Sequence, residues 1–236
     1  MTPNSLKWTP ASVPGRIALN GELVRLESLD LPRHAEPLFM ASHGAGGDSR
    51  LWDHLAYGPF ASQAEFTGWL EQRATSEDPL FFAVVDMATM RAQGMASYMR
   101  FKPEHGVIEI GHIWFAPSLQ RTRQATEAIF LLASNALDVL GYRRLEWKCD
   151  ALNEPSRRAA ERFGFTFEGV FRQHMVVKGR NRDTAWFAMT DGDWPHRRAA
   201  FEAWLTPGNF DSSGRQRKSL AALRALIERE SQRYQE

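Results

Sequence analysis

The feature that most constrains the fold is a succession of three strand-like stretches, followed at once by a long segment of helical periodicity. The stretches lie at residues 80–86, 93–101 and 107–115 and are separated by short turns. Apolar residues then recur at helical spacing over 120–140, and Gly141 ends that segment as a helix C-terminal glycine would. An antiparallel meander that leads into a helix predicts a mixed fold of the α/β (α+β) class.

The flanking segments extend this pattern. Before the meander we predict a strand, a helix and a second helix, at residues 22–29, 34–41 and 61–74. Between the two helices, three glycines within four positions predict a flexible loop over 42–48. After the long helix we predict a strand, a short helix and a hairpin, at residues 143–150, 155–163 and 165–190.

The ends of the chain differ from this central part. Residues 1–20 hold three prolines without apolar periodicity, which predicts an extended arm. We expect the folded domain to span 21–192 and a helical extension to span 193–236, with helices at 195–205 and 219–232. The last helix has an apolar face that needs a surface, and that surface could belong to a second copy in a homodimer.

Composition excludes several classes of protein. The 236 residues are 43% hydrophobic and 24% charged, as in globular proteins. Lys and Arg number 29 against 28 for Asp and Glu, a balance that favours neither nucleic acid nor a membrane as partner. The single cysteine, Cys149, excludes intrachain disulfides and multi-cysteine metal sites. With no membrane span or signal peptide visible, we expect a cytoplasmic protein without a metal.

The start of the long helix is a candidate anion site. A helix N-terminus presents free N–H groups and the positive end of the helix dipole, and Arg121 and Arg123 add charge there. The alternative is that both arginines belong to a solvated first turn. Cations are unfavourable at this end of a helix, so their presence favours an anionic ligand.

These residues resemble a cofactor motif of the GNAT acyl-CoA N-acyltransferases, in particular the RimJ/RimL-like branch. The family signature here is Gln/Arg-x-x-Gly-x-Gly/Ala, whose backbone amides hold the coenzyme A pyrophosphate. Gln120 and Ala125 fit that signature, whereas Arg123 stands in place of the first glycine. The resemblance covers residues 21–192 and implies a mostly antiparallel sheet with a splayed central strand pair.

A second stretch, from Asn153 to Phe165, is similar to the second cofactor motif of the family, Asn-x-x-Ser/Ala followed by a short helix and Gly-Phe. Two motifs in order are a stronger signal than one. Many members use a tyrosine in this helix to protonate the leaving thiolate, but Ala160 occupies its position. Ser156 would then take that part, although Asn153 and Ser156 could equally serve to cap the helix.

The resemblance implies acetyl-CoA as co-substrate. It would pair with the backbone at Trp114 and Phe115, a backbone amide near Trp114 would polarise the thioester carbonyl, and Asn153 would order the pantetheine end or a water. The pyrophosphate would lie against the first turn of the long helix, formed by Gln120, Arg121, Thr122, Arg123, Gln124 and Ala125.

Two residues on the strand at 107–115 compete for the role of general base. Glu109 lies eleven positions before Gln120, the spacing of the strand glutamate that serves as base in family members such as the histone acetyltransferases. His112 is an odd number of residues away, so only one of them can face the cleft unless the strand carries a bulge. Each could instead be an ordinary surface or core residue.

The segment around the Gly-rich loop would border the acceptor in such a fold. Histidines and aromatic residues gather there, and together with His112 they are candidates for substrate binding: His43, Trp52, His54 and Tyr57. The plain alternative is a packed insertion. No Gly-x-Ser-x-Gly, Walker A or His-Glu-x-x-His pattern is present, so hydrolase, NTPase and zincin functions have no support.

The sequence therefore predicts an N-acetyltransferase that acts on a primary amine by direct attack in a ternary complex. A protein N-terminal α-amine, with a pKa near 7.7 to 8.0, is roughly a tenth neutral at pH 7, which asks less of a base than lysine does. Small amines remain open as acceptors. The alternatives are a non-catalytic CoA-binding or interaction module, suggested by Arg123 and Ala160, and an RNA-docking protein, suggested by local arginine patches.

Overall fold

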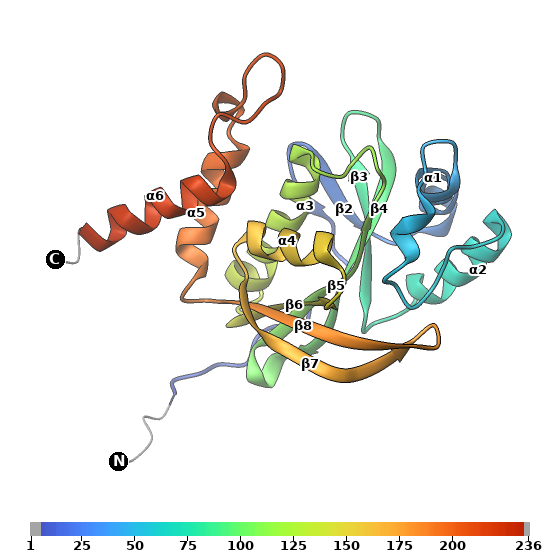
Figure 1. Ribbon diagram of the computed structural model, residues 1–236, viewed down its shortest axis with the longest axis horizontal. Helices are drawn as coiled ribbons and strands as arrows, with labels where there is room; N and C mark the ends of the chain where they lie inside the picture. Colours follow the sequence, from blue (N-terminus) through green and yellow to red (C-terminus); the bar gives the residue numbers. More distant parts are fainter. Residues whose placement is uncertain (1–5, 234–236) are drawn as a thin grey trace.

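The structure is a computed structural model that describes residues 6–233, an 8-stranded sheet with helices on both faces (Figure 1). Its strands are β1 (Leu19–Asn20), β2 (Val24–Ser28), β3 (Leu80–Asp86), β4 (Arg91–Lys102), β5 (Val107–Phe115), β6 (Arg144–Asp150), β7 (Thr166–Val177) and β8 (Arg180–Thr190). Its α-helices are α1 (Leu31–His43), α2 (Gln63–Ala74), α3 (Arg123–Ser134), α4 (Glu154–Phe163), α5 (Trp194–Leu205) and α6 (Leu220–Arg233). The predicted mixed α/β fold is confirmed. Residues 1–5 of the expected arm and 234–236 of the expected extension lie outside the described residues.

The sheet opens between its two central strands. Its order is β1-β2-β3-β4-β5-β6-β8-β7, and among the described strands all neighbours are antiparallel except β5 and β6. These two pair only from Val107 opposite Arg144 to Glu109 opposite Glu146. Beyond these residues β5 continues to Phe115 and β6 to Asp150 without pairing with each other. The predicted splayed central pair is confirmed.

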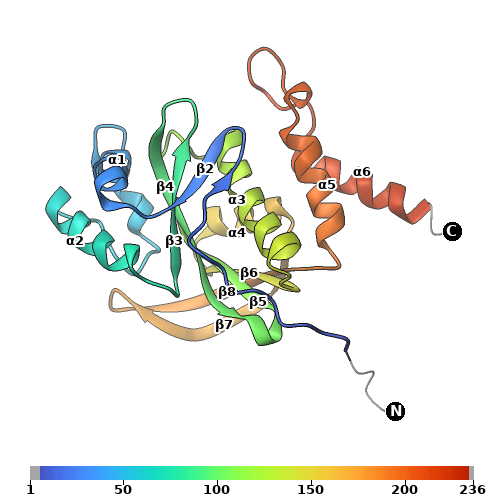
Figure 2. The same cartoon turned by 180° about the vertical axis from the view of Figure 1, so that it is seen from behind.

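Two cores lie on opposite faces of the sheet. Ile108, Ile110 and Leu145 point into the core beneath α3 and α4. Phe81 and Ala83 point into a second core, which α1 and α2 cover. Figures 1 and 2 show these helix pairs on either side of the sheet. Because side chains alternate along a strand, Glu109 faces the α1–α2 side.

The long helix differs from its prediction at both ends. α3 begins at Arg123 rather than at residue 120, and its N-cap is Thr122, whose hydroxyl accepts from the Ala125 N–H. Arg121 adopts a left-handed backbone with φ of 61°, which cannot continue into a helix, so 120–122 form a turn. At the other end residues 135–139 form a π-helix rather than α-helix.

The predicted helix at 34–41 is longer in the structure, and the loop after it is shorter. Asp30 caps the start of α1 by accepting from the Arg33 N–H at 3.0 Å, and the helix continues through His43. Ser42 and His43, expected in the loop, are therefore helical. Gly44 and Gly47 then form a turn, in which the Gly47 N–H donates to the Gly44 carbonyl at 2.8 Å.

Residues outside the central domain pack against it. In the N-terminal segment the Ala11 N–H donates to Pro103, and Leu19 pairs with Leu26 as part of the sheet. At the other end α5 lies against α3, and α6 against α5 and α4, with Leu220 buried. The apolar face of α6 thus finds part of its surface within the chain, where Leu223 and Ile227 pack against the core while remaining partly exposed. No helix within residues 6–233 has the length and apolar character that a membrane span requires.

Candidate active site

The opening between β5 and β6 contains a cavity of about 180 Å³. It is bordered by both splayed strands, by the start of α4, by the loop before α2 and by the β7–β8 hairpin. Among its lining residues are several of the predicted site residues, namely His54, Glu109, His112, Asn153 and Ser156. The structure therefore brings both candidate bases and the candidate proton donor to one cavity.

Residues from both faces of the sheet line this cavity. Trp147 and Cys149, which line it, belong to the core on the α3–α4 side, and Ser156 reaches it from α4. Glu109 and Lys148 line it from the opposite side. Two reactants could therefore approach from opposite faces and meet at the opening.

A bulge in β5 brings His112 to the same face as Glu109. Gly111 pairs with Ser97 and Trp114 with Met95, so two residues of β5 lie opposite one residue of β4. His112 has a left-handed φ of 50° within this bulge, and the buried Ser97 hydroxyl donates to the Gly111 carbonyl at 3.1 Å. The strict alternation that set Glu109 and His112 on opposite faces is thus broken, as the sequence analysis allowed.

The Glu109 carboxylate, only 3% exposed, is held between two cations. Its Oε2 lies 3.0 Å from Arg100 Nη1 and 3.0 Å from Lys148 Nζ. Its Oε1 has one weaker contact, with Arg100 at 3.4 Å. A charge buried this deeply requires such partners, because desolvation otherwise disfavours it strongly. Of the two oxygens, Oε1 keeps the greater capacity to accept a further proton or hydrogen bond.

Lys148 joins Glu109 to a second carboxylate. Its Nζ lies 2.6 Å from Glu146 Oε2 and 3.8 Å from the centre of the Trp186 ring. Sequence reasoning missed Arg100 and Lys148. A signal for the lysine was present, because Glu146, Lys148 and Asp150 alternate with apolar residues and so form a charged stripe on one face of β6.

His112 is a neutral imidazole at pH 7. Burial, reinforced by the charges of Arg100, Arg73 and Arg182, lowers its pKa to about 4. Its Nδ1 lies 3.2 Å from the Tyr57 hydroxyl, and the two rings stack with centroids 5.6 Å apart. His112 therefore carries no charge into the cavity under ordinary conditions.

At the start of α4, Ser156 and Asn153 have separate contacts. Asn153 is the N-cap, and its Oδ1 accepts from the Ser156 N–H at 3.1 Å. The Ser156 hydroxyl accepts from Trp147 Nε1 at 3.0 Å, so its own proton can donate to the neighbouring Cys149 sulfur or to a ligand in the cavity. Burial raises the pKa of the neighbouring Cys149 thiol, against which its hydrogen bond with Ser156 acts. Capping and cavity lining thus coexist in this turn.

The first turn of α3 has free backbone donors. Ala125 N–H is satisfied by Thr122, and Gln120 N–H by Ala116. For residues 121–124, in contrast, no N–H partner occurs within the described part of the chain. The Gln120 side chain donates to the Phe115 carbonyl at 2.9 Å, and that of Gln124 contacts Asp86. Free donors directly after β5 fit a pyrophosphate group.

The Arg123 side chain does not lie where we expected it. Its guanidinium donates to the Leu205 carbonyl at 2.7 Å and lies 4.4 Å over the Phe210 ring, so it points to the C-terminal segment. The side chain is therefore engaged away from the N-terminal end of α3, where we expected it to reinforce an anion site. Arg121, which is exposed, has no ion-pair partner among residues 6–233.

Two of the five proposed substrate-binding residues are packed instead. Trp52 is fully buried beside Trp114, and the centroids of their rings are 5.4 Å apart. His43 stacks on Phe39 and accepts from the Phe60 N–H, and burial lowers the pKa of its imidazole. Neither His43 nor Trp52 lines the cavity, because both pack in the aromatic cluster under α1 and α2. Their part in acceptor binding stays a prediction.

The other three members of that set lie at or next to the cavity. His54 lines it and has its Nδ1 3.5 Å from Asp150 Oδ2. Tyr57 does not line it, but its hydroxyl contacts His112 Nδ1. Trp114 is buried, with its ring among the α1–α2 aromatics, so only its backbone could meet a ligand in the opening. Phe115 is partly buried and packs against the other core.

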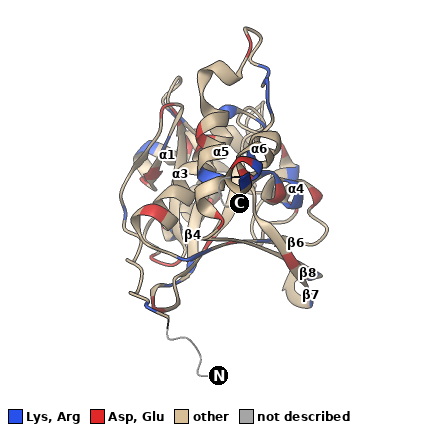
Figure 3. Ribbon diagram, turned by 90° about the vertical axis from the view of Figure 1, so that its left-hand side faces the viewer, with Lys and Arg blue, Asp and Glu red and all other residues tan. Residues whose placement is uncertain are grey.

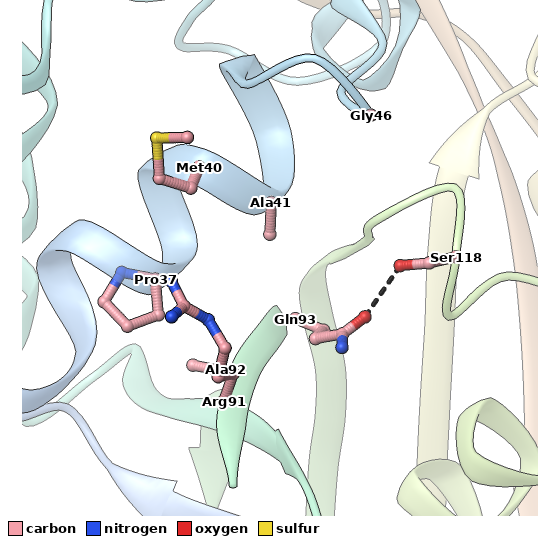
Figure 4. A pocket seen from close by; sticks show the side chains of 8 residues that line it. All are labelled: Pro37, Met40, Ala41, Gly46, Arg91, Ala92, Gln93 and Ser118. Atoms are coloured by element: carbon pink, nitrogen blue, oxygen red, sulfur yellow. Dashed lines mark hydrogen bonds between the residues drawn. The ribbon is translucent and has the colours of Figure 1, made fainter. Parts of the chain in front are cut away.

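A second, more open cavity of about 260 Å³ lies between α1 and the start of β4 (Figure 4). Pro37, Met40 and Ala41 line one side, and Gln93 and Ser118, joined by a hydrogen bond of 2.7 Å, line the other. None of the predicted catalytic or cofactor residues lines it. The splayed opening therefore remains the candidate active site. Over residues 6–233 no group of three His, Cys, Asp or Glu side chains could hold a metal ion.

A sheet opened between two parallel strands, with free helix N–H groups beside the opening, defines the class of acyl-CoA N-acyltransferase folds. The family model for the acetyltransferase (GNAT) domain matches residues 24–166. The chain belongs to the GNAT family of acetyltransferases, whose members use acetyl-CoA.

Solved structures agree with this assignment. A GCN5-related N-acetyltransferase from Brucella melitensis is 51% identical, with a TM-score of 0.90 over 93% of this chain and 99% of that one. An acetyltransferase of the GNAT family from Chromobacterium violaceum is 46% identical, with a TM-score of 0.75 over 83% and 96%. A Vibrio cholerae protein described as a ribosomal-protein-serine acetyltransferase shares the fold at 20% identity, with a TM-score of 0.62 over 74% and 97%. Nothing among curated proteins matches the chain.

Proposed function

We propose that the protein transfers an acetyl group from acetyl-CoA to a primary amine, by direct attack in a ternary complex. The observation that carries this proposal is the cavity lined from both faces of the sheet, which has Ser156 on one side and Glu109 on the other. The cofactor would enter from the α3–α4 side, and the amine from the α1–α2 side. Acetyl-CoA supplies an acetyl thioester, whose C–S bond is exchanged for a C–N bond as the thiol is released.

The residues that would hold the cofactor lie along the opening. The free N–H groups of residues 121–124 and the exposed Arg121 side chain would bind the pyrophosphate. Trp114 and Phe115 would offer backbone groups to the pantetheine, and Asn153 would order its end. A backbone N–H near Trp114, beside the β5 bulge, would donate to the thioester carbonyl oxygen, where negative charge develops.

Glu109 would take the proton of the amine, directly or through a water. Its Oε1 is the oxygen less engaged by Arg100 and Lys148, so it is the one available for this role. The two cations fix the orientation of the carboxylate, which is what a base in a defined geometry requires. His112 is neutral at pH 7 but, with a pKa of about 4, it is a weak base. We therefore assign His112 to acceptor binding.

Ser156 would donate a hydrogen bond to the departing sulfur. Because Trp147 Nε1 donates to its oxygen, the hydroxyl proton remains to donate, and the departing sulfur would replace Cys149 as its acceptor. A thiolate whose conjugate acid has a pKa near ~8.5 needs little more than such a hydrogen bond. The absence of the family tyrosine at Ala160 is then no obstacle to turnover.

The acceptor is a protein N-terminal α-amine or a small-molecule amine in this proposal. The RimJ/RimL-like motifs and the fold shared with the Vibrio cholerae protein support the first choice. The modest size of the cavity, about 180 Å³ against about 300–1,000 Å³ for sites of drug-sized ligands, suits a compact amine or the tip of a chain.

The test is release of coenzyme A thiol from acetyl-CoA in the presence of peptides and small amines, with product mass measured in parallel. Amine-dependent thiol release together with a 42-dalton mass gain, the mass of an added acetyl less one hydrogen by elementary arithmetic, would support the proposal. Binding of acetyl-CoA without transfer to any amine would instead support a non-catalytic CoA-binding module.

A further inference from the structure

Strand β8 presents an arginine to the acceptor side of the cavity. Trp186 pairs with Lys148 and Thr184 with Asp150, so these residues share the face that carries Glu109. Arg182 is two positions before Thr184 and, by the alternation of the strand, lies on the same face. It lines the cavity together with Glu109 and His112. The final hairpin thus contributes a cation to the surface where an amine would approach.

The other cationic side chains that line the cavity already have carboxylate partners. Arg100 and Lys148 both contact Glu109 at 3.0 Å, and Lys148 also contacts Glu146. Asp150 lies near His54. For the Arg182 side chain, in contrast, no salt bridge or hydrogen bond occurs within residues 6–233, and its Nε is buried without a partner. Arg182 is therefore the cation of the cavity whose guanidinium still lacks an acceptor, which a ligand could supply.

The chemistry of the guanidinium selects the partner. A buried N–H without an acceptor is costly, and a planar carboxylate can accept from two guanidinium N–H groups at once. The charge of Arg182 reaches the cavity, since it is among the causes of the lowered His112 pKa. Because His112 is neutral there, it neither repels nor attracts an ion at neutral pH.

We propose that Arg182 binds a carboxylate carried by the acceptor, so that the preferred acceptor is a small amine with a carboxylate beside it, of the α-amino acid type. Such a molecule presents its amine to Glu109 and its carboxylate to Arg182, both on one face of the opened sheet. A protein N-terminus has an amide at that position and offers Arg182 no anion. This inference rests on the proposed function and narrows its acceptor.

The experiment compares L-amino acids with their carboxamides, which keep the amine and side chain but lose the anion. For wild type we expect kcat/KM to favour the carboxylates. Arg182→Gln should lower the carboxylate-to-carboxamide ratio of kcat/KM by about 10- to 100-fold, as loss of a charged hydrogen bond does. Arg182→Lys should retain part of the preference, since it keeps the charge without the planar fork.

Arg180→Gln is the matched control, because Arg180 begins the same strand, is exposed and does not line the cavity. It should leave the ratio at the wild-type value. If Arg182→Gln lowers kcat/KM equally for both members of each pair, the inference is wrong while acetyl transfer stands.

Calorimetric titration with the same amino acids and carboxamides needs no turnover and separates the two proposals. Binding of the carboxylates that Arg182→Gln abolishes would support this inference even if no transfer occurred. Equal binding of carboxylates and carboxamides to wild type, or binding that the substitution leaves unchanged, would overturn it. A melting temperature equal to that of wild type would exclude misfolding of the variant as the cause.

Discussion

Glu109 and His112 line the same cavity, although they lie three positions apart on one strand. The relationship depends on the β5 bulge, in which His112 takes a left-handed φ of 50° and two residues face a single residue of β4. Bulges re-aim side chains in this way and are frequent next to active sites. The buried carboxylate and the neutral imidazole therefore face one cavity together.

Replacing Glu109 by glutamine should abolish most transfer. The amide keeps the size of the side chain but cannot accept the amine proton, so kcat should fall by about 10² to 10⁴. The affinity for acetyl-CoA, measured by calorimetry, should remain within a few-fold of wild type, because Glu109 lies on the acceptor side. Thiol release at saturating acetyl-CoA gives kcat.

Glu146→Gln is the matched control for this substitution. Glu146 is also a buried partner of Lys148, but it does not line the cavity. This variant should retain kcat within a few-fold. An equal loss in both variants would show that pairing with Lys148, rather than proton transfer, explains the effect.

Ser156→Ala should reduce both turnover and stability. The leaving sulfur loses its hydrogen-bond donor, and Trp147 Nε1, which donates to Ser156 at 3.0 Å, is left buried without an acceptor. The second effect should lower the free energy of unfolding by about 1–3 kcal/mol, measured by denaturant titration.

Trp147→Phe separates these two effects, since it removes the donor and keeps the serine hydroxyl. A kcat above that of Ser156→Ala is expected. The double variant should be less destabilised than the sum of the two single variants, because the unpaired Nε1 is gone. Equal kcat for Trp147→Phe and Ser156→Ala would argue against a role of the hydroxyl in turnover.

Alanine substitutions of the two arginines at the start of α3 should have opposite effects on stability and on acetyl-CoA affinity. Arg123→Ala breaks the contacts with Leu205 and Phe210, so the melting temperature should fall, by the equivalent of about 1–3 kcal/mol, with acetyl-CoA affinity nearly unchanged. Arg121→Ala should weaken acetyl-CoA binding and leave stability nearly unchanged. Weakened binding by Arg123→Ala at unchanged melting temperature would assign Arg123 to the phosphates after all.

Stability should decrease in mild acid because of His112. In the folded protein its pKa is lowered to about 4 from the 6.5 that is usual for histidine, so the unfolded chain binds the proton more readily between these values. The free energy of unfolding should therefore fall as pH drops from about 6.5 toward 4, by up to about 3 kcal/mol from this group. The lowered pKa values of the buried His34 and the half-buried His43 act in the same direction.

Thermal unfolding of wild type and His112→Asn from pH 4.5 to 7 tests this. The variant should show a weaker dependence on pH, whereas the exposed His105→Asn control should follow wild type. Parallel curves for all three proteins would contradict the assignment of the dependence to His112.

Much of the fold is readable from the sequence because the central strands have clear patterns. The strands at 80–86 and 107–115 occur with the predicted bounds. The start of the long helix could not be read, since its position depends on the left-handed backbone of Arg121, for which the residue type gives no warning. The bounds of a helix depend on such single positions more than its existence does.

Part of the site could also be predicted from local sequence patterns. Motif spacing pointed to Glu109, Asn153 and Ser156, and the structure brings these three to one cavity. The contacts of Glu109 with Arg100 and Lys148 depend on strand register and bulges, which a local pattern does not contain. The packing of His43 and Trp52 could not be decided from the sequence, because an aromatic cluster fits a pocket wall and a packed core equally well.

The most direct test of this account is acetyl transfer itself, measured with carbon-13 acetyl-CoA and a panel of amines, by mass spectrometry of the products. Wild type should give labelled N-acetyl product at a rate equal to thiol release, and Glu109→Gln at equal cofactor occupancy should give about 10² to 10⁴ times less. Transfer by Glu109→Gln at the wild-type rate, or thiol release by wild type without any labelled amine, would contradict the claim that this cavity is an N-acetyltransferase site.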